Sequence, residues 1–146
     1  MPIGLAARDT LRFEAAFCLY GHELDDNTTP LEAGLRWVVK FKKGEFRGRT
    51  ALLAQKESGT GKGLIGLELE GRNIARQGYE VERGGEVVGT VTSGTFSPTL
   101  RKSLALAYVG TSSLDTGVDF AVRVRNRTVP AARVDLPFYP SRAAEG

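Results

Sequence analysis

Short runs of β-forming residues, separated by turns, fill the chain from residue 64 onward. The runs are Leu64–Leu69, Tyr79–Glu82, Val87–Thr92, Leu104–Val109, Val118–Val124 and Ala132–Leu136. Turn sequences such as Arg83–Gly85 and Arg125–Arg127 separate neighbouring runs. Six short strands at hairpin spacing are typical of a small antiparallel barrel or sandwich. We therefore predict a six-stranded antiparallel β-barrel of Greek-key or jelly-roll type for this part of the chain.

The first part of the chain has a different pattern, because its apolar residues recur at helical spacing. Leu11, Ala15 and Leu19 share one stripe, which predicts a helix over residues 8–20 that ends at Gly21. This helix is apolar nearly all round, a pattern that indicates burial on several sides. No earlier segment of this sequence covers the second side, so we expect the chain to be part of a larger protein.

Two further helices are expected before the strands begin. Thr29–Glu32 has a capping threonine, a proline at the first helical position and a glutamate that can bond back to the cap. That helix must be short because Gly34 follows, and Trp37–Phe41 has strand character. The second helix is expected over residues 48–57 (GRTALLAQKE), which include Ala51, Leu52 and Ala54. The glycine-rich linker after it divides the α+β chain into residues 1–58 and residues 59–146.

Composition excludes several classes of protein. Charged residues make up 25% and apolar residues 41% of the chain, which is normal for a globular domain. No run of 18 apolar residues and no apolar leader is present, so we expect neither a membrane-spanning helix nor a signal peptide, and a cytoplasmic location. With one cysteine (Cys18) and one histidine (His22), the chain offers neither an internal disulfide nor a zinc site.

No motif in the chain forms a complete catalytic constellation. Gly59–Gly63 resembles a phosphate-binding loop but lacks its first glycine and its final Ser or Thr. Residues 36–62 carry eight basic side chains against Glu45 and Glu57, which fits a solvated face, a dock for an acidic protein or a nucleic-acid surface. No RNA-binding aromatic motif accompanies them, so we expect no nucleic-acid partner. Cys18 and His22 are expected to be core and turn residues rather than catalytic ones.

Longer strings resemble a known family. GLAARDTLR at 4–12, TPLEAGL at 29–35 and GTVTSGTFSPTL at 89–100 resemble, in order, the C-terminal part of the glycine cleavage system T-protein, an aminomethyltransferase. The resemblance covers essentially this whole chain, but only something over a third of a family member. It implies a three-domain cloverleaf around a tetrahydrofolate site. Residues 1–58 would then be the end of the folate-binding core, and residues 59–146 the C-terminal barrel.

The resemblance also implies a reaction and partners. Family members transfer an aminomethyl group from the lipoyl arm of H-protein to tetrahydrofolate and release ammonia. The family's key aspartate and a folate-contacting glutamate lie before residue 1, so we expect no catalytic residue in this chain and no activity from it alone. The lipoylated H-protein and the missing N-terminal portion of the same enzyme are the expected partners, with no metal required.

Three folate-binding residues follow from the resemblance. Arg8 matches the arginine of the family's AARD motif, and its alternative role is to pair with a carboxylate at a helix start. Phe17 occupies a position near the pterin, where it could stack or simply pack in a core. Trp37 belongs to a GLxW motif in which Arg36 replaces the usual glycine.

Two other interpretations stay open at this point. One is the folate domain of a related dimethylglycine- or sarcosine-oxidising enzyme, against which the TFSPTL string at 95–100 argues. The other is a non-catalytic module that binds folate or another protein.

Overall fold

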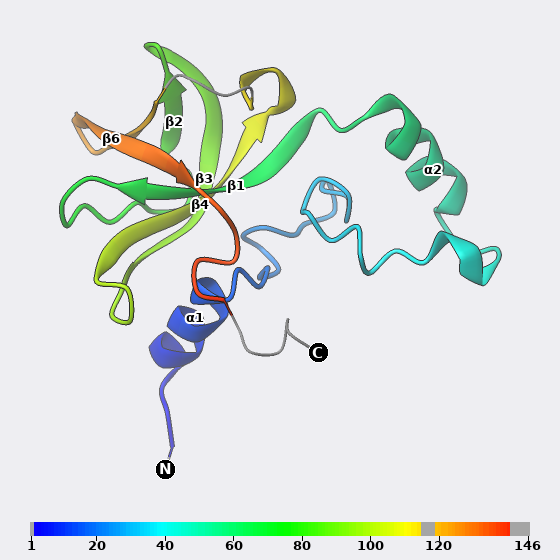
Figure 1. The fold of residues 1–146 in the computed structure, drawn as a ribbon, viewed down its shortest axis with the longest axis horizontal. Coiled ribbons are helices and arrows are strands. Elements are labelled where there is room, and N and C mark those ends of the chain that lie inside the picture. The colour runs from blue at the N-terminus through cyan, green and yellow to red at the C-terminus, as the bar shows by residue number, and fades with distance from the viewer. Residues whose placement is uncertain (1, 115–118, 141–146) are drawn as a thin grey trace.

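A computed structural model describes residues 2–114 and 119–140, and it consists of a β-barrel, an N-terminal helix against the barrel and a projecting arm (Figure 1). The strands of the barrel are β1 (Lys62–Leu69), β2 (Glu80–Arg83), β3 (Glu86–Ser97), β4 (Lys102–Gly110), β5 (Phe120–Val124) and β6 (Arg127–Val134). The helices are α1 (Leu5–Glu14) and α2 (Arg49–Ser58), with short 3₁₀ turns at Phe41–Lys43 (η1) and Thr111–Ser113 (η2).

The six strands close into an antiparallel barrel, as the sequence predicts. The strands follow one another around the barrel in the order β1-β4-β3-β2-β5-β6. The consecutive strands β2, β3 and β4 form hairpins, and β1 returns to lie beside β4, which is a Greek-key connection. Closure leaves no sheet edge exposed. The prediction of a six-stranded barrel within an α+β chain is confirmed.

The barrel is filled by alternate residues of its strands. Leu67, Val81 and Val122 point inward and are fully buried together with the small residues Ala105 and Ala107 of β4. Glycine allows the closest approach between neighbouring strands and loops. A Cβ on Gly89 would lie 2.1 Å from the Tyr108 carbonyl oxygen, and one on Gly94 would lie 2.2 Å from that of Ala75.

Helix α1 covers the outside of the barrel at β3 and β4. Phe13 inserts between Leu104 and Leu106 of β4 and stacks on Phe138 at 5.0 Å between ring centroids. Because β4 faces the barrel interior on one side and α1 on the other, its residues 103–109 are all buried. Next to Phe13, the buried Glu14 carboxylate accepts hydrogen bonds from hydroxyl groups of the β3–β4 hairpin.

The helix predicted over residues 8–20 is shorter than expected and ends at Glu14. Ala16 adopts a left-handed conformation with φ of 56°, where a glycine is usual. The Ala16 N–H donates to the Phe13 carbonyl (2.9 Å) and the Phe17 N–H to the Arg12 carbonyl (2.8 Å). These two bonds form a Schellman motif, which closes the helix five residues before Gly21.

Two other local predictions differ from the structure, one in part. The Thr29–Glu32 capping box forms, with the Thr29 N–H 3.0 Å from the Glu32 carboxylate, and Gly34 (φ of 74°) ends the segment as expected, but residues 30–34 form a turn rather than a short helix. Trp37–Phe41 is not a strand, since no neighbouring strand pairs with it, and its last residue starts η1. Helix α2 is close to its predicted range.

Strand boundaries differ from the predicted ones by a few residues. Strand β3 continues to Ser97, five residues beyond the predicted end, and β6 begins at Arg127 rather than at residue 132. The first residue of the predicted strand 118–124 lies outside the described residues. The added residues of β3 pair with β4, and those of β6 pair with β5, so pairing extends each strand past its own apolar run, which the sequence of one strand does not reveal.

Candidate functional site

A buried carboxylate organises the turn that follows α1. Glu23 is fully buried, and its Oε2 accepts hydrogen bonds from the Arg12 guanidinium at 2.9 Å and from the Leu19 N–H at 3.0 Å. Its Oε1 accepts from the hydroxyl groups of Thr92 at 2.7 Å and Ser93 at 2.5 Å. An ionised carboxylate is tolerated in a protein interior when a cation and hydrogen bonds satisfy it in this way.

An irregularity in β3 makes this network possible. Successive residues of a strand normally point to opposite faces, but Thr92 and Ser93 both bond to Glu23. The register of β3 against β4 shifts between Val91 and Ser93, which marks a β-bulge. The bulge turns two neighbouring hydroxyl groups toward the same carboxylate, and it thereby anchors the turn after α1 to the barrel.

Arg12 connects this network to α1. Its guanidinium bonds to Asp9 (2.8 Å), to Glu23 and to the Ser93 hydroxyl (3.1 Å). The donors of Arg12 are thus directed at protein atoms, and its side chain is largely buried. Arg12 therefore positions the helix rather than offering a free charge to a ligand.

A hollow of about 540 Å³ lies beside this network, between α1 and the turn after it. The residues that line it are Leu5, Arg8, Asp9, Arg12, Phe17, Cys18, Leu19 and His22. The Arg8 side chain is exposed and makes no ion pair or hydrogen bond with any residue in the described ranges, so it does not pair with a carboxylate at the helix start. Phe17 is 64% exposed rather than part of the core. The fold thus brings Arg8 and Phe17, two of the residues selected by resemblance, to one hollow.

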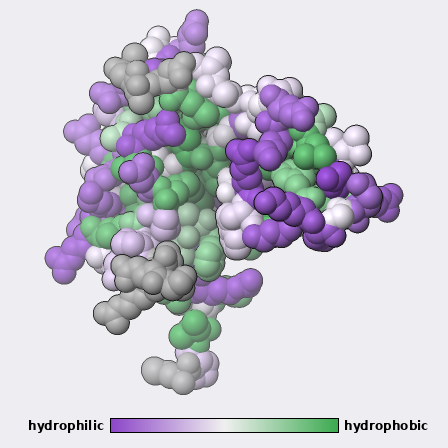
Figure 2. All heavy atoms as spheres, turned by 45° about the vertical axis from the view of Figure 1, so that its right-hand side comes forward, coloured by the Kyte–Doolittle hydropathy of each residue, from purple (hydrophilic) through white to green (hydrophobic). Residues whose placement is uncertain are grey.

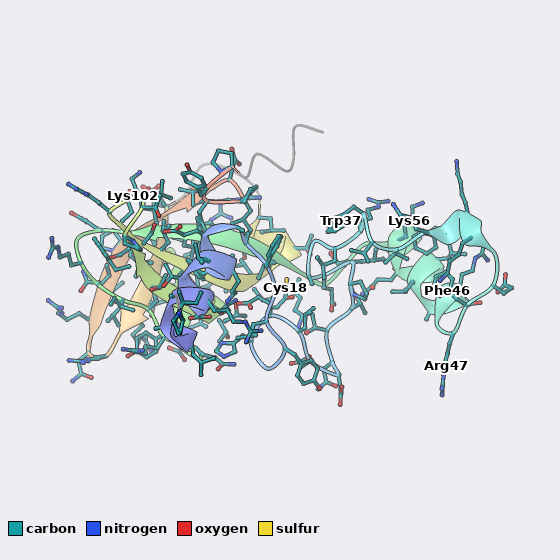
Figure 3. All side chains as sticks on the ribbon, turned by 90° about the horizontal axis from the view of Figure 1, so that it is seen from below. Cys18, Trp37, Phe46, Arg47, Lys56 and Lys102 are labelled. Atoms are coloured by element: carbon teal, nitrogen blue, oxygen red, sulfur yellow. The ribbon has the colours of Figure 1, made fainter. Side chains whose placement is uncertain are left out.

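Trp37 does not share this hollow. Its side chain is 70% exposed where the arm begins (Figure 3), and it is absent from the lining of the hollow that holds Arg8 and Phe17. Its role in folate binding stays a prediction.

His22 reaches the site although its sequence context suggests an ordinary turn residue. Its Nδ1 lies 2.9 Å from the Thr92 carbonyl oxygen, which can only accept, so Nδ1 carries the proton and donates. His22 also lines a second hollow of about 500 Å³ that includes Asp25, Lys62 and Tyr108. The partners His22 and Thr92 are 70 residues apart, so no local pattern connects them.

Two titratable groups near the site are held in their neutral forms. Burial raises the pKa of the Cys18 thiol, and the Glu23 carboxylate raises it further against a smaller opposite effect of Arg12. A raised pKa disfavours the reactive thiolate. Burial also raises the pKa of Tyr108 far above its ordinary value, and the Tyr108 hydroxyl donates to the Glu23 carbonyl oxygen at 2.7 Å.

The basic stretch 36–62 lies almost entirely on the arm, which we define as residues 36–61. Helix α2 of the arm has no buried residue, and hydrophilic side chains gather over the arm around a smaller apolar patch (Figure 2). Lys43 and Lys56 lie over the rings of Phe46 and Phe41, at 5.1 Å and 5.2 Å from the centroids. Lys62 differs, because it bonds to Thr28 and stacks on Tyr108 beside the barrel.

Two kinds of site are not found in the described part of the chain. Across residues 2–114 and 119–140, no group of three or more His, Cys, Asp or Glu side chains could hold a metal ion. No helix among these residues has the length and apolar character needed to span a membrane.

Comparison with protein families matches both ends of the chain. Residues 62–140 match the family described as the glycine cleavage T-protein C-terminal barrel domain, and residues 1–43 match the one described as the GCVT N-terminal domain. A solved structure, the glycine cleavage system aminomethyltransferase T from Bartonella henselae, superposes with a TM-score of 0.86 at 33% identity. The superposition covers 94% of this chain and 39% of that one.

Curated relatives point to the same family. An aminomethyltransferase of Thermosynechococcus vestitus is 55% identical over 94% of this chain and 38% of its own length. One from Rubrobacter xylanophilus is 57% identical over 94% of this chain and 37% of its own. The chain thus spans somewhat over a third of the length of the curated relatives that it matches. With its barrel domain matched along residues 62–140, the chain belongs to the glycine cleavage T-protein family.

Proposed function

We propose that this chain supplies the α1 hollow and the C-terminal barrel of a tetrahydrofolate-dependent aminomethyltransferase. Such an enzyme moves an aminomethyl group from the lipoyl arm of H-protein to tetrahydrofolate and releases ammonia. The observation that carries the proposal is that Arg8 and Phe17 line one hollow in a chain whose relatives are named aminomethyltransferases. We also propose that the enzyme is located in the cytoplasm.

The free side chains of the hollow suit tetrahydrofolate. The Arg8 side chain has no intramolecular partner among the described residues, so its planar guanidinium can donate two parallel hydrogen bonds to a carboxylate or to a polar ring edge. Phe17 exposes an aromatic face on which a flat ring system can stack. Arg12 and Glu23 hold α1 and the following turn in place, which fixes the distance between Arg8 and Phe17 before a ligand arrives.

Among the described residues that line the hollow, none offers a free carboxylate for proton transfer. Asp9 is the one acidic residue among them, and it is bonded to Arg12 at 2.8 Å. We propose that the carboxylates of the reaction come from the part of the relatives' length that this sequence does not contain, and that residues 1–58 complete a folate-binding unit to which residues 59–146 add the barrel. The chain by itself is then expected to show no aminomethyltransferase activity. Sustained ammonia release by the purified chain, given tetrahydrofolate and H-protein whose lipoyl arm carries the aminomethyl group, would refute this.

The arm is a suitable docking surface for H-protein if that protein is acidic. Lys42, Lys43 and Arg47 are exposed near its tip, and Arg47 points away from the rest of the molecule (Figure 3). Such a surface steers an acidic partner and makes association sensitive to salt. Reversing these three charges in a full-length relative should weaken H-protein binding and flatten its salt dependence. Unchanged affinity at low salt would remove the arm from the docking surface.

Calorimetric titration of tetrahydrofolate tests the folate site directly. The chain is titrated alone and together with the separately expressed N-terminal part of a related aminomethyltransferase. We expect binding only in the mixture, and a loss of at least about tenfold in affinity with Arg8→Ala, which removes charge-assisted hydrogen bonds. Arg36→Ala, an exposed arginine outside the hollow, is the matched control.

The other outcomes distinguish the alternatives. Strong binding by the chain alone would favour an independent folate-binding module. Binding in the mixture that is equally strong in Arg8→Ala and the parent chain would show a folate site that does not use the α1 hollow. No binding in either case would leave this chain without a part in folate recognition.

A further inference from the structure

A second hollow is surrounded by arginines at a different place on the barrel. Arg72 and Arg76 come from the connection between β1 and β2, and Arg125 and Arg127 from the hairpin between β5 and β6. Both loops lie on the side of the barrel away from α2 (Figure 1). Together they line a hollow of about 540 Å³, which shares no residue with the α1 hollow. We call these four residues the arginine cluster.

The arginine cluster is not neutralised by acidic side chains. No Asp or Glu is among the described residues that line its hollow. The side chains of Arg76 and Arg125 make no ion pair or hydrogen bond with any residue in the described ranges, and Arg72 lies over the Phe96 ring at 5.5 Å. Arg127 donates only to the uncharged amide of Asn73, at 3.3 Å.

Arg123 on β5 shows a different arrangement, because it bonds to the carboxylates of Glu80 and Glu82 on the neighbouring strand. The arginine cluster has no such carboxylates among the described residues that line its hollow. Four like charges around one hollow repel one another instead, and a bound anion would remove that repulsion.

The hollow is assembled before a ligand arrives. The bond from Arg127 to Asn73 ties the β5–β6 hairpin to the β1–β2 connection, and Asn73 in turn donates to the Glu70 carbonyl oxygen at 2.8 Å. Arg125 adopts a left-handed conformation with φ of 55°, which few residues other than glycine or asparagine adopt readily. Non-glycine residues in this conformation are often found at binding sites.

We propose that the arginine cluster binds a small organic anion that carries two or more negative charges on phosphate or carboxylate groups. Guanidinium groups recognise both kinds of group through paired hydrogen bonds. The volume of the hollow is that of a small-molecule site. Ile74 and Tyr79 also line it, and they provide apolar surface for the uncharged part of the ligand. This proposal does not depend on the folate site.

Calorimetric titration with two probes tests the site and separates the two sources of charge. Pyrophosphate represents phosphate ligands, and a triglutamate peptide represents oligocarboxylates. We expect at least one probe to bind, and the double variant Arg76→Ala/Arg125→Ala to weaken that binding at least about tenfold. The control Arg101→Ala/Arg133→Ala removes the same charge from exposed positions on the barrel outside the hollow and should leave binding within about twofold of the parent chain. The tighter probe identifies the ligand class.

Further measurements make the test decisive. Thermal unfolding of both double variants checks that they fold. The variant Arg76→Lys/Arg125→Lys keeps the positive charge but cannot donate the paired hydrogen bonds of a guanidinium group, so it should bind more weakly than the parent chain. Binding that falls equally in the Arg76→Ala/Arg125→Ala variant and in the Arg101→Ala/Arg133→Ala control would reduce the effect to net charge and overturn the proposal. So would the failure of both probes to bind. Retention of an acidic protein by the cluster without binding of either probe would indicate a protein interface instead, which also overturns it.

Discussion

Glu23 is the residue on which the geometry of the α1 hollow depends. It accepts from the side chains of Arg12, Thr92 and Ser93, which belong to α1 and β3, and from the Leu19 backbone of its own turn. Leu19 also lines the α1 hollow, as does His22, the residue before Glu23. A single buried carboxylate therefore holds together the helix, the turn and the strand that position Arg8 and Phe17.

Replacing Glu23 tests whether its carboxylate holds the helix, the turn and the strand together. We expect Glu23→Ala to destabilise the fold by about 3–5 kcal/mol, because it leaves the Arg12 guanidinium without its buried partner. Urea denaturation measures the change. Glu45→Ala is the control, since the Glu45–Arg49 ion pair is exposed and should contribute about 0–1 kcal/mol. Similar losses from the two variants would contradict the assignment of Glu23 as the organising residue.

Tyr108 provides a prediction for alkaline pH. Its pKa and that of Cys18 are raised in the folded state above their ordinary values of 10.0 and 9.0. The folded protein therefore keeps protons that the unfolded chain releases, so the stability from both groups is full below about pH 9 and falls as pH rises above it. We expect denaturation free energies measured from pH 7 to 11 to fall less steeply in Tyr108→Phe. Tyr79→Phe is the control. If the fall of the unfolding free energy with pH is as steep in Tyr108→Phe as in the parent chain, Tyr108 does not contribute to the loss of stability at alkaline pH.

At the scale of elements, α1 is held to the barrel chiefly by Phe13. Its ring is 1% exposed and packs on Leu104, Leu106 and Phe138, whereas Leu11 on the same helix is 61% exposed. The helix ends at Glu14, a Schellman motif with Ala16 in the left-handed conformation closes it, and the turn that follows contains Glu23. The element that presents Arg8 is thus attached at its C-terminal end, while its N-terminal turn carries the exposed Leu5.

Replacing Phe13 tests whether the packing of its ring holds α1 to the barrel. We expect a loss of about 3–5 kcal/mol from Phe13→Ala, because a cavity forms between α1 and β4. The matched control Leu11→Ala removes an exposed side chain and should change stability by less than about 1 kcal/mol. Hydrogen exchange should also show faster opening of α1 in Phe13→Ala than of the barrel strands. Equal protection of α1 in both variants would mean that the bonds of Glu14 and Glu23 suffice to hold it.

The whole molecule exposes an unusual amount of apolar surface around α1. Ile3, Leu5, Leu11, Phe17 and Tyr20 are each more than 60% exposed. Contiguous apolar patches of this kind normally mark a surface that another protein segment covers. The relatives contain further chain that this sequence lacks, so this surface suits contact with it.

Measurements of self-association test whether the exposed apolar surface around α1 is available for contact. We expect the purified chain to bind a hydrophobic dye and to sediment as species larger than a monomer at micromolar concentrations. The double variant Leu5→Glu/Leu11→Glu should restore a monomer with reduced dye binding, whereas Val87→Glu on the barrel, 53% exposed in the parent chain, should not. A parent chain that stays monomeric and binds no dye would contradict the prediction.

The sequence alone determined the parts of this protein that local patterns encode. Short runs of β-forming residues between turns predicted the six strands, the residues at 48–57 predicted α2 closely, and strings such as GTVTSGTFSPTL indicated the family. The end of α1 at Glu14 was missed because Ala16, an alanine, adopts the left-handed conformation that glycine usually adopts after a helix. The tertiary structure decided which residues share a site. It placed Arg8 with Phe17 but not with Trp37, brought His22 to Thr92, and gathered four arginines from two distant loops. Contacts between residues far apart in the chain arise only when the barrel closes, so no local periodicity records them.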